Sequence, residues 1–133
     1  MKVLVEIALF VWQLPQNLLG ALLSIGSEKA EAFGKAVRLK ERFFSSGVSL
    51  GKFIIMEKGL EGEKSVRHEA GHQWQSAALG PLYLIVVGIP SLARNVWDRL
   101  FHKDWTYQMR KVWYYSGWPE SQADELGGVD RWA

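Results

Sequence analysis

Two long stretches without a charged residue constrain the fold of this chain more than any other feature. They cover residues 7–27 and 73–93, and each is about 20 residues long, the length that a helix needs to cross a bilayer. Prolines and several amide side chains interrupt both stretches, and these groups fit lipid less well than a protein core. The pattern favours membrane association, with the basic residues that follow each stretch on the cytoplasmic side. The alternative is a soluble cytoplasmic protein with a buried helix pair that kinks at Pro15.

Length and composition exclude several classes of protein. A chain of 133 residues corresponds to one domain, so we expect a single domain over 1–133 with apolar segments at 1–26 and 77–93. The 16 Lys and Arg residues nearly balance the 14 Asp and Glu residues, and no basic stripe indicates a nucleic-acid partner. Cysteine does not occur, which excludes disulfides, thiol nucleophiles and cysteine-ligated metal sites. Imidazole chemistry is limited to three histidines.

Local patterns predict an α+β fold that is mainly helical and contains a small β-sheet. The segments 36–44 and 47–57 combine partial period-two alternation with β-branched residues, and Gly47 and Gly51 suggest turns. We therefore expect a hairpin or a sheet of two to three strands. The basic residues near these strands are typical of a solvated face, and a membrane-surface patch is the alternative.

Two helices are expected in the second half of the chain. The first covers residues 65–80, with Ser65 as its N-cap and Gly80-Pro81 as its stop. The apolar run 82–89 follows and closes at Pro90. The second helix begins near Pro119 and ends at Gly127-Gly128.

Residues 68–72 read His-Glu-Ala-Gly-His, an HExxH motif on the first of these helices. Residues at i and i+4 share one face of a helix, so both imidazoles can reach one metal ion at the ~2.0–2.1 Å of a zinc–nitrogen bond. Glu69 lies beside them and can act as general base on a water molecule. Gly71 is a poor helix former, and its presence is explained if another backbone packs closely there. The alternative is a pair of solvated or core histidines.

A catalytic zinc ion needs a third protein ligand, and without cysteine the candidates are a carboxylate or His102. Glu120 and Asp124 are spaced i, i+4 on the last helix. Glu120 can bind the metal while Asp124 accepts the free ring N–H of a ligating histidine. Alternatively, Pro119 followed by an acidic residue is simply a favourable helix start. In a closed structural site, His102 would be the remaining histidine for a fourth position.

The two motifs HEAGH (68–72) and ESQAD (120–124) resemble those of the gluzincin zinc metallopeptidases. Within that class, the motifs are similar to those of the HtpX and CAAX-prenyl endopeptidase group and of the minigluzincins. The resemblance implies an upstream edge strand that holds peptide substrate, a role that residues 47–55 can fill by strand addition. It also implies a zinc site with His68, His72 and Glu120 as ligands, Glu69 as the catalytic base and Asp124 as the partner of a ligating histidine.

The resemblance predicts a zinc-dependent metallopeptidase that hydrolyses peptide or protein substrates and uses Zn2+ as cofactor. The oxygen of the scissile carbonyl would need a donor side chain, and the available donors are Tyr114, Tyr115, His102 and Arg131. The rival interpretation is a non-catalytic zinc-binding or membrane-interaction protein in which HEAGH is structural or coincidental. Membrane lipid is the further expected partner, and nucleic acid is not expected.

Overall fold

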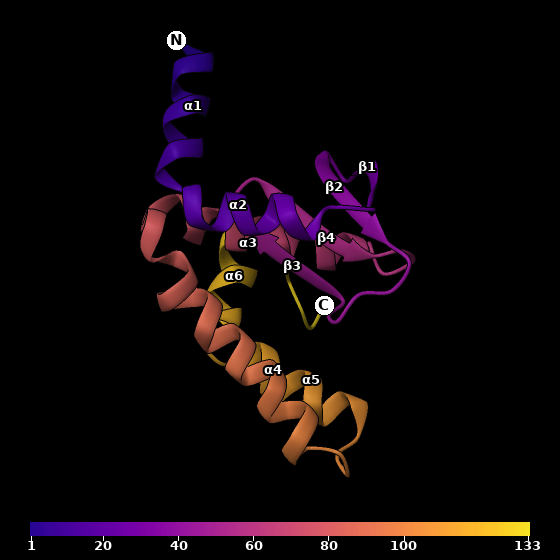
Figure 1. Ribbon diagram of the computed structural model, residues 1–133. Coiled ribbons are helices and arrows are strands. Elements are labelled where there is room, and N and C mark those ends of the chain that lie inside the picture. The colour runs from indigo at the N-terminus through magenta and orange to yellow at the C-terminus, as the bar shows by residue number, and fades with distance from the viewer.

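The computed structural model describes residues 1–133 and places two helices before a small sheet and the other helices after it (Figure 1). The predicted α+β class is confirmed, with six α-helices and a mixed sheet of four strands rather than two or three. The elements are α1 (Lys2–Trp12), α2 (Leu14–Leu23), β1 (Glu28–Ala32), β2 (Lys35–Lys40), β3 (Gly47–Leu50), β4 (Phe53–Glu57), α3 (Glu63–Leu79), the 3-10 turn η1 (Gly80–Leu82), the π-helical turn η2 (Leu84–Gly88), α4 (Ile89–Phe101), α5 (Tyr107–Ser116) and α6 (Glu120–Gly127).

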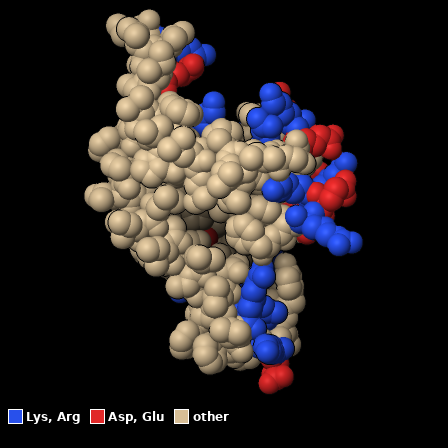
Figure 2. Space-filling model, viewed as in Figure 1, with Lys and Arg blue, Asp and Glu red and all other residues tan.

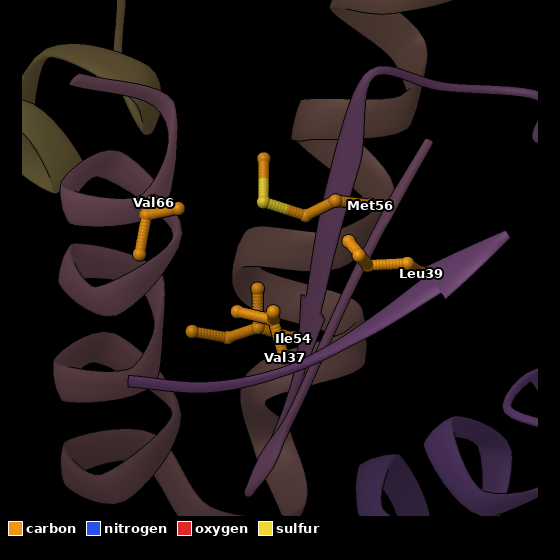
Figure 3. Packing of buried hydrophobic residues seen from close by; sticks show 5 residues of the cluster. All are labelled: Val37, Leu39, Ile54, Met56 and Val66. Carbon is orange, nitrogen blue, oxygen red and sulfur yellow. The ribbon is translucent and has the colours of Figure 1, made fainter. Parts of the chain in front are cut away.

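The sheet has the strand order β1-β2-β4-β3, so β1 and β3 are its edges. β1 pairs with β2 and β3 pairs with β4 in antiparallel fashion, whereas β2 and β4 are parallel. Alternate residues of β2 and β4 point to one face, because the side-chain period of a strand is two. Their buried side chains meet Val66 of α3, which packs on that face (Figure 3); the cluster consists of Val37, Leu39, Ile54, Met56 and Val66.

The backbones of α3 and α6 touch directly. A Cβ atom on Gly71 would lie 1.8 Å from the carbonyl oxygen of Ala123, and one on Gly127 would lie 2.0 Å from that of Arg67. No side chain fits at either position, so the two glycines allow an approach that other residues would prevent. The expectation that another backbone packs closely against Gly71 is confirmed.

The ends of the central helices differ in part from the expectation. The prediction that Ser65 is the N-cap of the HExxH helix is wrong: Gly62 has the extended cap conformation, its carbonyl oxygen accepts the N–H of Val66, and α3 begins at Glu63. An acidic residue at that position suits the positive end of the helix dipole. The stop at Gly80 is confirmed, with a φ of +55°. Pro90 does not close the apolar run, because the helical chain continues through it from the π-helical turn η2 into α4.

The helix pair at the N-terminus is broken near Pro15 but is not buried. α1 and α2 are bent by 85° at Gln13, and Pro15 lies in the first turn of α2. No residue of α1 is buried, so the alternative of a buried pair is wrong. Taken singly, none of the helices has the length and apolar character to cross a bilayer, whereas α1 and α2 meet those criteria only as a bent pair.

Candidate metal centre

Three buried side chains from α3 and α6 converge on one point. His68 and His72 lie one turn apart on α3, and Glu120 is the first residue of α6. The Nε2 atoms of His68 and His72 lie 2.9 and 3.0 Å from the same carboxylate oxygen, Oε2 of Glu120. The ligand atoms of the three residues all lie within 4.8 Å of one another, so this group could hold a metal ion. The group is formed by residues of α3 and α6.

The other ring nitrogen of His68 is held by Asp124. Nδ1 lies 2.8 Å from Oδ1 of Asp124, and an ionised carboxylate only accepts, so Nδ1 is the donor. Arg131 holds Asp124 in turn, with its Nε and Nη2 atoms donating over 3.0 and 2.7 Å. This chain of contacts fixes the ring so that Nε2 points at Glu120.

Gln75 holds the second histidine in the same way. Nδ1 of His72 donates to Oε1 of Gln75 over 2.6 Å. The amide nitrogen of Gln75 donates to the carbonyl oxygen of Pro119 and to Gln122, over 3.1 and 3.0 Å, which turns its oxygen toward the ring. Sequence reasoning missed Gln75, although its position three residues after His72 on the same helix could have indicated it.

Ser91 and Tyr114 hold the second oxygen of Glu120. The hydroxyl of Ser91 in α4 donates to Oε1 of Glu120, and the hydroxyl of Tyr114 in α5 lies 3.2 Å from the same atom. The α4–α5 hairpin therefore closes one side of the group. Ser91 was missed as well, and no local pattern distinguishes it from another serine in an apolar helix.

Glu69 lies on the same helix with its carboxylate beside β3. A Cβ atom on Gly47 would lie 2.9 Å from Oε1 of Glu69, so a larger residue at this position would displace the carboxylate. Oε2 of Glu69 is buried without a hydrogen-bond partner. Burial, which disfavours the charged form, raises the pKa of this carboxyl.

Burial and hydrogen bonding act in opposite directions on the converging residues. Burial lowers the pKa of His68, but the hydrogen bonds to Asp124 and Glu120 outweigh it and raise that pKa to about 9. For Glu120, burial raises the pKa, but the hydrogen bonds from His68 and His72 bring it well below its usual range. The group therefore stabilises the ionised form of Glu120, the form that binds a metal ion.

Two of the candidate donors have other contacts. His102 is not brought to the group: its Nδ1 lies 2.9 Å from Asp98, and its ring stacks on Trp105 with the centroids 3.7 Å apart. His102 is therefore not one of the residues that converge with His68 and His72. The guanidinium of Arg131 is engaged by Asp124 and lies over the ring of Tyr115, 3.7 Å from its centroid.

The neighbouring residues Tyr114 and Tyr115 contact the converging residues with different parts of their side chains. Tyr115 packs the edge of its ring against His68, with the centroids 5.2 Å apart, and burial raises the pKa of its hydroxyl to about 12. Tyr114 brings its hydroxyl to Glu120 itself. Burial and then the charge of Glu120 raise the pKa of Tyr114, so its hydroxyl stays protonated and is a donor. Of the four candidate donors, Tyr114 is the one whose polar atom touches one of the converging residues.

Comparisons with models of protein families, with curated proteins and with solved structures found no match. The resemblance to the gluzincins therefore rests on the two motifs and on the group that they form. The chemistry of this group of residues fits a divalent transition metal, because imidazole nitrogens and carboxylate oxygens are ligands that such ions accept. Glu69, which lies between His68 and the next turn of the same helix, has a buried oxygen without a hydrogen-bond partner.

Proposed function

We propose that this protein is a zinc-dependent metallopeptidase. The observation that carries the proposal is the convergence of His68, His72 and Glu120 next to the buried carboxylate of Glu69. Two histidines and a glutamate are the protein ligands of a known class of catalytic zinc sites. When bound there, zinc supplies a water molecule of lowered pKa and a Lewis acid for the scissile carbonyl.

Three protein ligands favour a catalytic site over a structural one. A structural zinc site is closed by four protein ligands, whereas a catalytic site keeps one position open. The group contains three such residues, and His102, the remaining histidine, has Asp98 and Trp105 as its neighbours. Non-catalytic zinc binding therefore remains the alternative with less support.

Glu69 takes the role of general base in this proposal. Its carboxylate is buried beside the ligands, and its pKa is raised by that burial, so it holds an abstracted proton more readily than an exposed glutamate would. Because Oε2 has no partner in the protein, it can accept a hydrogen bond from the attacking water without giving up another contact.

Tyr114 is the residue that we assign to the oxygen of the scissile carbonyl. Its hydroxyl already reaches into the group from α5, and it is protonated at neutral pH. A donor aimed at the oxygen that gains charge stabilises the transition state more than the ground state. Ser91 acts as a positioning residue, since it donates to Oε1 of Glu120.

The peptide backbone would pair with the open part of the β3 edge. β3 is an edge strand, and Gly47 at its start lies against Glu69. The carbonyl oxygen of Ser49 already accepts a hydrogen bond of 2.9 Å from Tyr83, and Ser49 and Leu50 are buried. The accessible edge is therefore short, Gly47–Val48, and strand addition would be confined to it.

Zinc content and peptide hydrolysis test the proposal together. Wild type, Glu69→Gln and Glu120→Ala are purified side by side, zinc per chain is measured by elemental analysis, and hydrolysis is followed with a library of quenched-fluorescence peptides. Glu125→Ala is the matched control, because Glu125 is an exposed carboxylate on the same helix.

We expect about one zinc ion per chain in the wild type, in Glu69→Gln and in the control, and a clear loss in Glu120→Ala. Hydrolysis should fall at least about 100-fold in Glu69→Gln, the lower end of what general base catalysis contributes. Zinc binding with no hydrolysis across the library would favour the non-catalytic alternative. Equal zinc in wild type and Glu120→Ala would remove Glu120 from the ligand set.

A further inference from the structure

α4 is polar on the side that faces the protein and apolar on the side that faces away. Its inward residues Ser91, Arg94 and Asp98 bond to Glu120, to the carbonyl oxygens of Trp113 and Tyr114, and to Arg110. Its outward stripe, spaced at helical intervals, is exposed and consists of Leu92, Val96 and Leu100. A helix on the surface of a water-soluble protein has the opposite arrangement, with its apolar stripe toward the core.

α2 has the same inverted arrangement, with its polar side chains toward the protein and its apolar side chains exposed. Its buried residues are Gln16, Asn17 and Gly20, and the two amides bond to Ser76, to Gly80 and to the backbone of Phe10 and Lys52. The side chains on its outer face are exposed leucines: Leu14, Leu18 and Leu22. Two separate helices therefore keep their polar side chains inside and their leucines outside.

α1 continues this surface. It projects from the body, none of its residues is buried, and Lys2 and Glu6 are its only charged side chains (Figure 1). Helices that are apolar on nearly all sides are found inside large cores or in membranes. We call the exposed apolar stripes of α2 (Leu14, Leu18 and Leu22) and α4 (Leu92, Val96 and Leu100) together with α1 the apolar face.

Charged side chains are sparse on the apolar face, where Lys2 and Glu6 of α1 are the exceptions. Figure 2 shows a largely uncharged surface that runs from α1 over α2 and down α4; apart from charged atoms along one side of α1, Lys, Arg, Asp and Glu gather over the sheet and beside α5. We propose that the apolar face is embedded in the hydrocarbon boundary of a lipid bilayer, with the helices lying along the interface and the sheet in water.

The chemistry of the apolar face fits lipid better than a protein partner. The leucine and valine side chains of the α2 and α4 stripes offer no donor or acceptor, whereas protein interfaces carry about one hydrogen bond per 100–200 Å². The helices satisfy their own backbone groups, as contact with hydrocarbon requires. Trp12 donates its indole N–H to the carbonyl oxygen of Ala77 over 2.9 Å, so this donor already has a partner within the protein.

The lack of cysteine allows a direct test with the full chain. Three variants each carry one cysteine labelled with a polarity-sensitive fluorophore. Leu92→Cys and Leu18→Cys place it on the apolar face, and Glu31→Cys on β1 is the matched control on the charged side. Leu92 and Leu18 are 56% and 60% exposed, so neither change disturbs the core. The probe is a vesicle of neutral phosphatidylcholine, added in low salt and in about 1 M salt, where charge attraction is screened within roughly 3 Å.

We expect a blue shift and a several-fold rise in fluorescence at positions 92 and 18 when vesicles are added, equal at both salt concentrations, and none at position 31. No response at 92 and 18 overturns the proposal, as does an equal response at all three positions. A blue shift without vesicles that grows with protein concentration would show instead that a second copy covers the apolar face. Adding Glu69→Gln to the labelled Leu92→Cys variant should leave the fluorescence response to vesicles unchanged, so vesicle binding and peptide hydrolysis can fail independently.

Discussion

The sheet and the two helices α2 and α4 distribute polar and apolar side chains in opposite ways. In β2, Val37 and Leu39 are buried while Arg38 and Lys40 between and after them are partly exposed, the usual order for a protein in water. In α2, Gln16 and Asn17 are buried and Leu18 is exposed. Most buried polar groups of both regions have partners, with Gln16 Oε1 of α2 and Ser49 Oγ of β3 among the exceptions, but the opposite distribution indicates that the regions face different surroundings.

α3 joins these two regions because its sides meet different partners. Val66 packs into the apolar cluster of the sheet, while His68 and His72 turn to α6. Farther along, Ser76 bonds to Gln13 and Gln16 at the break between α1 and α2. The candidate metal centre therefore lies where the water-facing sheet and the inverted helices meet.

The largest effect is expected where α3 and α6 touch. Gly71→Ala places a methyl group 1.8 Å from the carbonyl oxygen of Ala123, so the helices must separate. We expect a loss of about 3 kcal/mol or more in the free energy of unfolding, or failure to fold, measured by urea denaturation. The control Gly88→Ala meets only an ordinary contact of 3.7 Å and should stay within about 1 kcal/mol of wild type. Similar stability in both variants would contradict the direct backbone contact.

A substitution in the apolar cluster of the sheet should come next. Ile54 is 1% exposed, and Ile54→Ala removes most of its buried side chain. We expect the free energy of unfolding to fall by about 3 kcal/mol, from lost burial and the cavity that remains. A change below about 1 kcal/mol in the same urea experiment would mean that the sheet region unfolds before the transition that is measured.

The buried amides of α2 should matter as much as an apolar core residue of moderate size. Gln16→Ala leaves the hydroxyl of Ser76 and the carbonyl oxygen of Gly80 without their 2.8 Å partner. The expected loss of unfolding free energy is about 2 kcal/mol, the range for buried polar groups left unpaired. Gln108→Ala, at an exposed glutamine of α5, is the control and should change little. If Gln16→Ala leaves the free energy of unfolding unchanged, the buried polar contacts of the helical region do not stabilise the protein.

The smallest effect is expected on the apolar face. Leu18→Ser exchanges an exposed leucine for a polar residue and should shift the free energy of unfolding by less than about 0.5 kcal/mol in buffer without vesicles. The same change should weaken vesicle binding, because it removes apolar area from the surface that contacts lipid. A large loss of stability in buffer would reveal a protein contact at this position.

Local spacing was sufficient for the central part of the candidate metal centre. The i, i+4 rule places His68 and His72 on one face, and the same rule puts Asp124 one turn beyond Glu120. The start of the last helix, the stop at Gly80 and the close packing at Gly71 also followed from residue types with strict backbone preferences. These features depend on neighbours within one or two turns, which a sequence records directly.

The sequence by itself therefore determined the motif pair, the α+β class and the two uncharged stretches. The tertiary structure decided which side of each helix faces the protein, that Gln75 and Ser91 support the converging residues, and that His102 does not reach them. Hydrophobic periodicity predicts a buried apolar stripe, and it misleads in α2 and α4, where the polar side is inside. The physical reason is that a sequence specifies the two sides of a helix, but only packing against distant elements selects the side that is buried.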